Sequence, residues 1–174
     1  MAQFLIWNGP APTTAGQATV TTGASIKTML QVKPSATLPM RIRGWRFSTS
    51  APSALSTGLV ELVETDVAAT VTAHVAAGLV KYDSAALNCG DPTSNLIQVG
   101  TTSTGYTSAG EGSITATRVL DAVTVVIPTT GGATFYYQFP LGEQPELQLG
   151  LFARIRVTFD QAVNMRCAML VELG

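Results

Sequence analysis

Two stretches near the C-terminal end of the chain alternate apolar and polar residues at a period of two, and they constrain the fold most. The stretches cover residues 151–159 and 163–171. A period of two places successive side chains on opposite faces of a strand, so each stretch predicts a strand with one buried face. Asp160 and Gln161 lie between them and are suited to a turn, so we expect the two strands to form a hairpin.

Similar short patterns recur along the whole chain between clusters of Gly, Pro, Asn and Asp. They cover residues 4–7, 18–22, 26–32, 40–48, 58–64, 79–82, 114–119, 123–127 and 134–139. Short strands separated by turn residues are typical of sandwiches and barrels. We therefore predict an all-β fold, an antiparallel β-sandwich of jelly-roll-like type, as a single domain with long loops.

The segment 65–79 fits two interpretations. Valines at positions 67, 71 and 75 have helical spacing, but the same stretch also alternates at a period of two. Valine and threonine favour extended backbone. We expect strand or irregular structure here, with at most one or two helical turns.

One strand pattern slips by one residue. Met40 and Ile42 are apolar in one phase, and Trp45 and Phe47 are apolar in the other, with Gly44 between them. A β-bulge would let both halves face the same core, and glycine tolerates the backbone of a bulge. We therefore expect a bulge or unusual backbone angles at Gly44.

The apolar side chains of Phe4, Leu5, Ile6 and Trp7 are unsuited to a free tail in water. A segment rich in Pro, Gly and Thr follows them. We predict an N-terminal strand and linker arm over residues 1–16 and a β-sandwich domain over residues 17–174. The strand could join the sheet of its own subunit or reach a neighbour. The linker composition favours a reach across or along the subunit edge, so that deleting residues 1–8 would leave a folded domain.

Residues 84–113 are rich in Gly, Ser and Thr, with one apolar interruption at residues 96–99. A loop that long is uncommon within a compact domain and is usually functional. We expect it to be a mobile contact for assembly.

The chain carries few charges. Charged residues make up 12% of it, about half the usual share of roughly 25%. A surface of Thr, Ser, Ala and Gly loses little when it is desolvated, which suits subunit contacts, and an ordinary neutral β-domain fits the composition equally well. The net charge of -1 gives no general attraction to nucleic acid or to an anionic membrane.

No apolar run approaches the ~20 residues of a membrane helix. The first residues lack the basic region of a signal peptide and soon meet Asn8, Gly9 and Pro10, which indicates synthesis inside the cell.

The residues that usually carry catalysis or bind metals are isolated. His74 is the single histidine, and neither Cys89 nor Cys167 belongs to a CxxC pair. The cysteines are more often free in an unsecreted chain, although a disulfide remains an alternative. Nucleotide-binding, metalloprotease and hydrolase motifs are missing, and turn chemistry explains most of the aspartates. We expect no metal, no cofactor and no enzymatic activity, with a carboxylate-based glycosidase module as the weaker alternative.

Four arginines offer a possible contact patch. Arg41 and Arg43 share one strand face, and Arg154 and Arg156 share another. If the two strands were neighbours, the guanidinium groups could bind carboxylates of a partner chain. Pairing within the subunit is the favoured alternative. Its candidate partners are Glu61, Glu64, Glu146 and Glu172.

The C-terminal third resembles a known family. Residues 139–146 (FPLGEQPE), 151–158 (LFARIRVT) and 161–165 (QAVNM) resemble the end of small virion structural proteins of tailed bacteriophages of actinobacteria. Residues 59–64 (LVELVE) look like the central strand of that family. The chain departs from the family at residues 171–174, where an acidic pair is expected. The resemblance implies a β-sandwich that decorates or builds part of the particle, often as a trimer.

The first expectation for function is a capsid decoration or minor capsid protein that stabilises the particle. It would be made in the host cytoplasm and reside in the virion. Its partners would be its own copies, as a homo-oligomer with a trimer favoured, and the major capsid protein or other virion proteins. A tail or fibre component with a receptor- or carbohydrate-binding head is the alternative, and exposed Tyr82, Tyr106, Tyr136 or Tyr137 would favour it. The candidate subunit contacts are Phe4, Leu5, Ile6, Trp7, Arg41, Arg43, Arg154, Arg156 and Tyr106.

Overall fold

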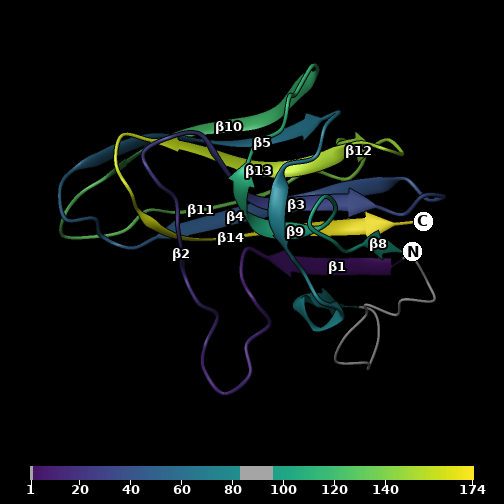
Figure 1. Ribbon diagram of the computed structural model, residues 1–174, viewed down its shortest axis with the longest axis horizontal. Coiled ribbons are helices and arrows are strands. Elements are labelled where there is room, and N and C mark those ends of the chain that lie inside the picture. Colours follow the sequence, from purple (N-terminus) through teal and green to yellow (C-terminus); the bar gives the residue numbers. More distant parts are fainter. Residues whose placement is uncertain (1, 83–95) are drawn as a thin grey trace.

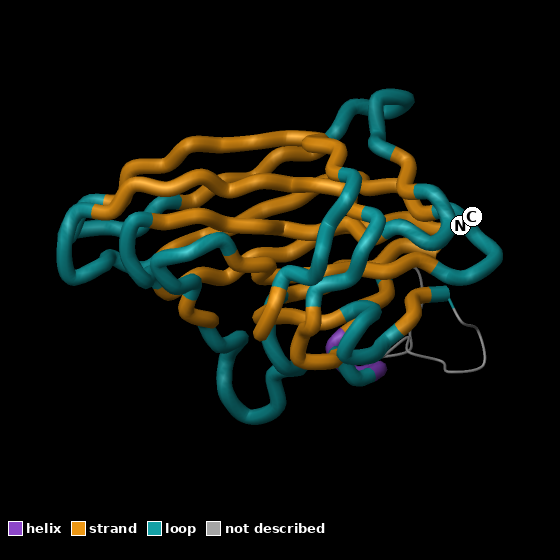
Figure 2. The backbone as a smooth tube through the Cα atoms, turned by 45° about the horizontal axis from the view of Figure 1, so that its top comes forward, coloured by secondary structure: helices purple, strands orange, loops and turns teal. Residues whose placement is uncertain are grey.

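Strands make up most of the computed structural model, which describes residues 2–82 and 96–174. One short 3-10 helix, η1 (Ala76–Gly78), is the only helical element among these residues. The strands form two layers that run lengthwise along the molecule (Figures 1 and 2). The chain is therefore an all-β sandwich, as its alternation predicted.

Each layer is a sheet of seven strands. Sheet A has the order β11 (Thr134–Gln138), β4 (Met40–Thr49), β14 (Asn164–Leu173), β1 (Ala2–Trp7) and β7 (Leu79–Lys81), with β12 (Glu146–Leu147) beside β4 and β2 (Val20–Thr21) beside β14. Sheet B has the order β10 (Thr117–Ile127), β5 (Ser56–Thr65), β13 (Phe152–Phe159), β3 (Lys27–Pro34), β9 (Gly105–Gly110) and β6 (Thr70–Ala73), with β8 (Ile97–Gln98) beside β3.

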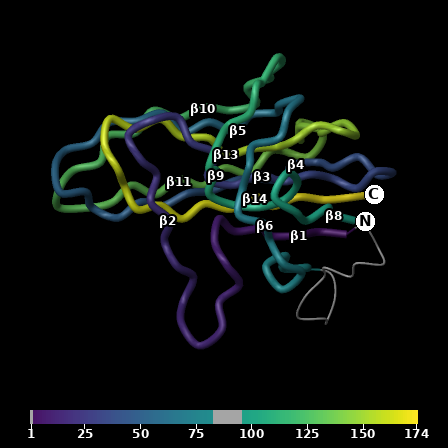
Figure 3. The backbone as a smooth tube through the Cα atoms, viewed as in Figure 1, coloured from purple at the N-terminus to yellow at the C-terminus, as the bar shows by residue number. Residues whose placement is uncertain are grey.

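The eight main strands pair in a nested order. The first pairs with the last, β1 with β14, followed inward by β3 with β13, β4 with β11, and β5 with β10, all antiparallel. This long double ribbon wraps so that β14 also pairs with β4 and β13 with β5. The result is a jelly roll. Both ends of the chain consequently lie together at one end of the sandwich (Figure 3).

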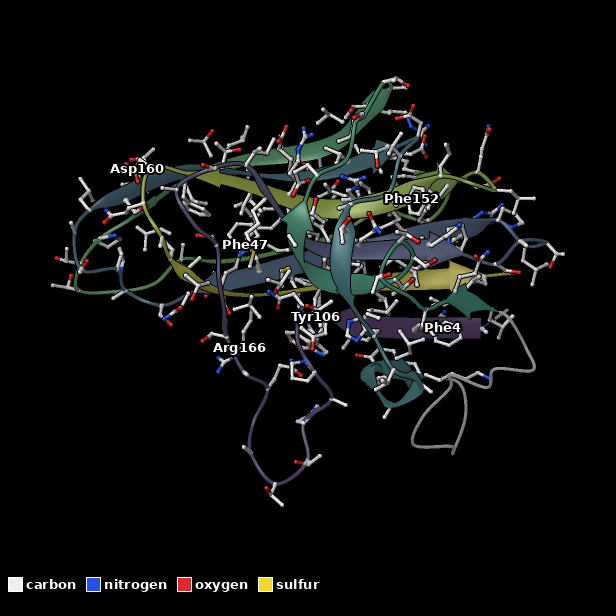
Figure 4. All side chains as sticks on the ribbon, viewed as in Figure 1. Phe4, Phe47, Tyr106, Phe152, Asp160 and Arg166 are labelled. Atoms are coloured by element: carbon white, nitrogen blue, oxygen red, sulfur yellow. The ribbon has the colours of Figure 1, made fainter. Side chains whose placement is uncertain are left out.

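The hairpin that we expected at the C-terminal end does not form. Strand β13 lies in sheet B and β14 in sheet A, so residues 160–163 cross from one layer to the other. Asp160 anchors this crossing (Figure 4), because its Oδ1 accepts hydrogen bonds from Ser56 Oγ at 2.8 Å and from the Thr57 N–H at 3.1 Å. The alternation identified the buried face of each strand correctly. It carried no information on which strand lies alongside.

The bulge expected at Gly44 is confirmed. Leu170 of β14 lies opposite Gly44, whereas Val171 lies opposite Ile42, so Arg43 is the extra residue of β4. The slip lets Ile42 and Trp45 both face the core between the sheets. A Cβ atom on Gly44 would lie 2.7 Å from the carbonyl oxygen of Tyr137 on the neighbouring strand β11.

The connection between β5 and β10 is an insertion with its own strands. It contains β6, η1, β7, β8 and β9, so residues 96–113 are not the open loop that we expected, and residues 84–95 lie outside the described part. Within it, residues 65–79 form a short strand and one 3-10 turn, in line with the prediction. Residues 114–119 and 123–127 are not separate strands, because β10 is continuous, with a register shift between Val119 and Asp121.

The N-terminal strand belongs to its own subunit's sheet. Strand β1 lies between β14 and β7, and Phe4 and Ile6 are fully buried in the core (Figure 4). Residues 2–7 therefore complete the sheet of their own subunit, which was one of the two alternatives for this strand. The loop after β1 is partly exposed, and Arg166 Nε donates a hydrogen bond of 2.7 Å to the carbonyl oxygen of Gln17 within it.

Candidate functional site

His74 is a structural residue of the insertion. It is buried, its Nε2 lies 2.7 Å from the carbonyl oxygen of Trp7, and its ring packs on Tyr106 with centroids 4.9 Å apart. Burial lowers the pKa of His74 below its ordinary value. Tyr106, a candidate subunit contact, is half-buried by this packing.

The described residues hold no cluster of metal-binding side chains. No group of three or more His, Cys, Asp or Glu side chains in residues 2–82 and 96–174 could hold a metal ion. Cys167 is free and buried, and burial raises the pKa of its thiol well above the usual range. Cys89 lies outside the described residues.

The four arginines do not form a common patch. Arg41 and Arg43 are on β4 in sheet A, whereas Arg154 and Arg156 are on β13 in sheet B. Each pairs with a glutamate of its own subunit. The pairs are Arg41 with Glu146 (3.2 Å), Arg43 with Glu172 (2.5 Å), Arg156 with Glu61 (3.2 Å) and Arg154 with Glu111 (3.3 Å). The structure thus shows pairing within the subunit, which was the favoured alternative.

Arg154 is fully buried and so is not a subunit contact. Its guanidinium donates to the carbonyl oxygens of Val67 and Glu111 and pairs with the Glu111 carboxylate. Burial lowers the pKa of Arg154, and the Glu111 charge opposes that shift. The sequence placed Arg154 correctly on the outer face of its sheet. Val67 and Glu111, at the two ends of the insertion, cover this face, and nothing in the sequence near Arg154 indicated that they would.

The outer face of sheet A has a small hollow. Its volume is about 90 Å³, and it is lined by Leu5, Gly44, Trp45, Arg46, Tyr82, Tyr136, Ala168 and Leu170. Strand register explains the set, because Tyr136, Arg46, Ala168 and Trp7 follow one another across β11, β4, β14 and β1. Leu5 and Trp7, two of the predicted contacts, thus belong to an outer surface, unlike Phe4 and Ile6.

Arg46 is unusually placed beside this hollow. Its guanidinium carbon lies 4.4 Å from the centre of the Trp7 ring, a cation–π contact. Its Nε is buried without a hydrogen-bond partner, and no carboxylate of the described residues pairs with it. A buried donor without a partner costs stability unless a ligand or a neighbouring molecule satisfies it.

The two lateral edges of the sandwich differ. On one side, which we call the closed edge, β7 covers β1, and β8 and β9 cover β3. On the other, which we call the open edge, β10 pairs only with β5, and β11 only with β4, within the described part. Strand β10 runs along the upper rim in Figure 1. It is 11 residues long and exposes apolar residues such as Val126, which is 59% exposed.

The charges of β10 are already paired. Arg118 binds the Glu64 carboxylate at 2.6 Å, and Asp121 accepts a 2.9 Å hydrogen bond from Trp45 Nε1. Natural edge strands are commonly protected by free lysines, prolines or a covering loop. Strand β10 has a bulge at Leu120 and the charged residues Arg118 and Asp121, but it contains no lysine and no proline.

No protein-family model, no curated protein and no solved structure matches the chain. Among residues 2–82 and 96–174, no helix has the length and apolar character needed to cross a membrane.

Proposed function

We propose that the chain is a virion structural protein of the capsid decoration or minor capsid type, which stabilises a particle through contacts with its own copies and with other virion proteins. The observation that supports this most is the contrast between the closed and open edges. An edge strand with free backbone donors and acceptors can take up a strand of another chain. Strand β10 offers that edge over 11 residues.

Two further features agree with an assembly role. The ion pairs lie within the subunit, so a face can be desolvated without stranding many charges. Jelly rolls also occur in capsid proteins, although lectins and cupins share the architecture, so this support is an analogy of fold. The proposal includes no catalysis, cofactor, membrane or nucleic-acid contact. It places the protein in the virion after synthesis in the host cytoplasm, as a homo-oligomer with a trimer favoured.

The open edge is tested by placing charge on it. Thr124→Lys and Val126→Lys each add a lysine to exposed positions of β10. We expect both to weaken binding to particles that lack the protein, because a charged edge resists pairing with another strand. Thr158→Lys is the matched control, since Thr158 is exposed on the central strand β13 of the same sheet. Particle binding that is equal in all three variants and the unaltered protein would overturn the edge contact.

A second candidate is a tail or fibre component with a carbohydrate-binding head. Its support is the exposure of Tyr82 and Tyr136, at 55% and 58%, on the rim of the hollow. Aromatic rings beside a few polar groups are typical of small-ligand sites. Binding to a panel of host-surface glycans, lost in Tyr136→Ala and kept in Thr134→Ala on the same strand, would favour this candidate.

A further inference from the structure

The loop between β11 and β12 presents a leucine to solvent. Leu141 is 86% exposed, the highest fraction among the large apolar side chains described. The loop is held as a turn, because the Glu143 N–H donates to the carbonyl oxygen of Pro140 at 3.0 Å and Gly142 has a φ of +90°. Such a fixed, exposed apolar side chain is suited to insertion into another surface.

Within residues 2–82 and 96–174, Glu143 is the one glutamate that has no arginine partner. Glu61, Glu64, Glu111, Glu146 and Glu172 each pair with an arginine of the same subunit, whereas the exposed Glu143 side chain makes no ion pair with a described residue. Arg46 is the counterpart of Glu143, because it is an arginine without a carboxylate partner among the described residues. Two arginines make no ion pair with a described carboxylate. Arg166 donates to the Gln17 carbonyl oxygen, and Arg46 keeps a buried Nε without a partner.

The hollow beside Arg46 has the size and lining for an aliphatic side chain. Its volume of about 90 Å³ is several times the roughly 10–15 Å³ needed to hold one water. Leu5, Ala168 and Leu170 supply apolar lining, and Arg46 supplies the charged group. Leu141 does not line this hollow in its own subunit, where it lies near Arg41 and Glu146 instead.

We propose that Leu141 of one copy inserts into the hollow of a second copy, and that Glu143 of the first pairs with Arg46 of the second. The contact buries the exposed leucine and gives both unpaired charges a partner. It joins two different surfaces, so it is heterologous and forms a ring, such as a trimer, when the rotation between copies closes. The proposal rests on the self-association included in the proposed function.

Charge reversal tests the contact. In sedimentation velocity over micromolar concentrations, we expect Glu143→Arg and Arg46→Glu each to raise the dissociation constant about tenfold or more, because a charge-assisted pair is lost. The double variant restores association, since the pair is re-formed with the charges exchanged. In an equal mixture of the two single variants, every contact between unlike copies joins opposite charges, so mixed assemblies form.

A second test avoids Arg46, whose contact with Trp7 also contributes to the fold. Leu141→Ser should reduce association, whereas Leu55→Ser, at a leucine that is 61% exposed elsewhere, should not. If the unaltered protein associates and Leu141→Ser and Glu143→Arg associate equally well, the contact is overturned while assembly through another surface stands. If the unaltered protein stays monomeric, both this contact and the proposed self-association are overturned. Particle binding through β10 is then tested separately with Thr124→Lys and Val126→Lys.

Discussion

Along the closed edge, the two sheets end in the short strands β6 and β7 of the insertion, of four and three residues, whereas along the open edge sheet B ends in β10, which is 11 residues long. An insertion of about 50 residues thus extends the sheets at the closed edge, whereas the long strand β10 at the open edge has no such addition. Because long exposed edge strands promote association, the proposed contacts with other proteins are expected on the side of β10.

The two sides are also held together by different forces. At the closed edge, polar side chains bind the insertion to the sandwich: Gln31 donates to the Ser103 carbonyl oxygen at 2.6 Å and accepts from the Ala69 N–H at 2.8 Å. At the open edge, Phe135 packs on Trp45 and Phe47, with centroids 4.9 and 5.3 Å apart. Packing of aromatic rings tolerates an exposed edge, whereas buried hydrogen bonds require a complete cover.

The largest effect is expected where the closed edge meets the core. Phe4→Ala should lower the free energy of unfolding by about 3–5 kcal/mol, because the ring is fully buried between the sheets. Gln3→Ala, whose side chain is half-buried on the outer face of β1, should cost much less. Urea denaturation measures both. Deleting residues 1–8 should prevent folding, contrary to the expectation of a detachable arm, and a folded deletion variant would contradict the role given to β1.

Next in size is the ion pair that holds the insertion over sheet B. Glu111→Ala leaves the guanidinium of Arg154 buried without its carboxylate and removes an acceptor from Thr28, so we expect a loss of about 3 kcal/mol. Glu143→Ala is the matched control and should change stability by less than about 0.5 kcal/mol. Equal melting temperatures for the two variants would show that Glu111 does not secure the closed edge.

A smaller loss is expected at the open edge. In Gly44→Val the new side chain meets the carbonyl oxygen of Tyr137, so β11 must shift, at a cost of about 1–3 kcal/mol. Gly131→Val is the control, since nothing lies within 4 Å of a Cβ atom there. An unchanged unfolding curve for Gly44→Val would remove the argument for a close approach of β4 and β11.

The smallest effect is a pH dependence confined to the closed edge. Burial holds the folded-state pKa of His74 below its ordinary value of 6.5, so the unfolded chain binds the proton more readily. The contribution of the neutral His74 to the free energy of unfolding should therefore be fully present above pH 6.5 and decline as the pH falls below it. His74→Gln should flatten this decline in melting curves between pH 7.5 and about 5.5, because His74 is the single histidine. An identical decline in the variant would assign it to other groups.

Local features were predictable from the sequence, and pairings between distant segments were not. The bulge at Gly44 shows in the order of neighbouring residues, and so do the inward faces of β13 and β14. The partners of β14, by contrast, lie more than a hundred residues earlier in the chain, in β1 and β4. A turn-like Asp160 therefore suggested a hairpin where the chain in fact changes sheets.

The same distinction explains the candidate site. Alternation placed Arg154 on the outer face of its sheet. It could not show that Glu111 covers Arg154, because Glu111 lies 43 residues earlier in the chain and no periodic pattern links the two. Arg46 was not singled out, since its position beside Trp7 and Tyr136 depends on the register of four strands. The difference between Glu143 and the other glutamates, which pair with arginines, was likewise visible only from the positions of the strands.

The nested pairing also sets the order of events during synthesis. Strand β14 lies between β4 and β1, and β13 lies between β5 and β3, so each sheet lacks a central strand until the last of the chain is made. Contacts so distant in sequence form slowly, and the waiting segments expose strand edges that invite aggregation. A chain that ends before residue 164 lacks β14 and therefore cannot join β4 to β1 in sheet A.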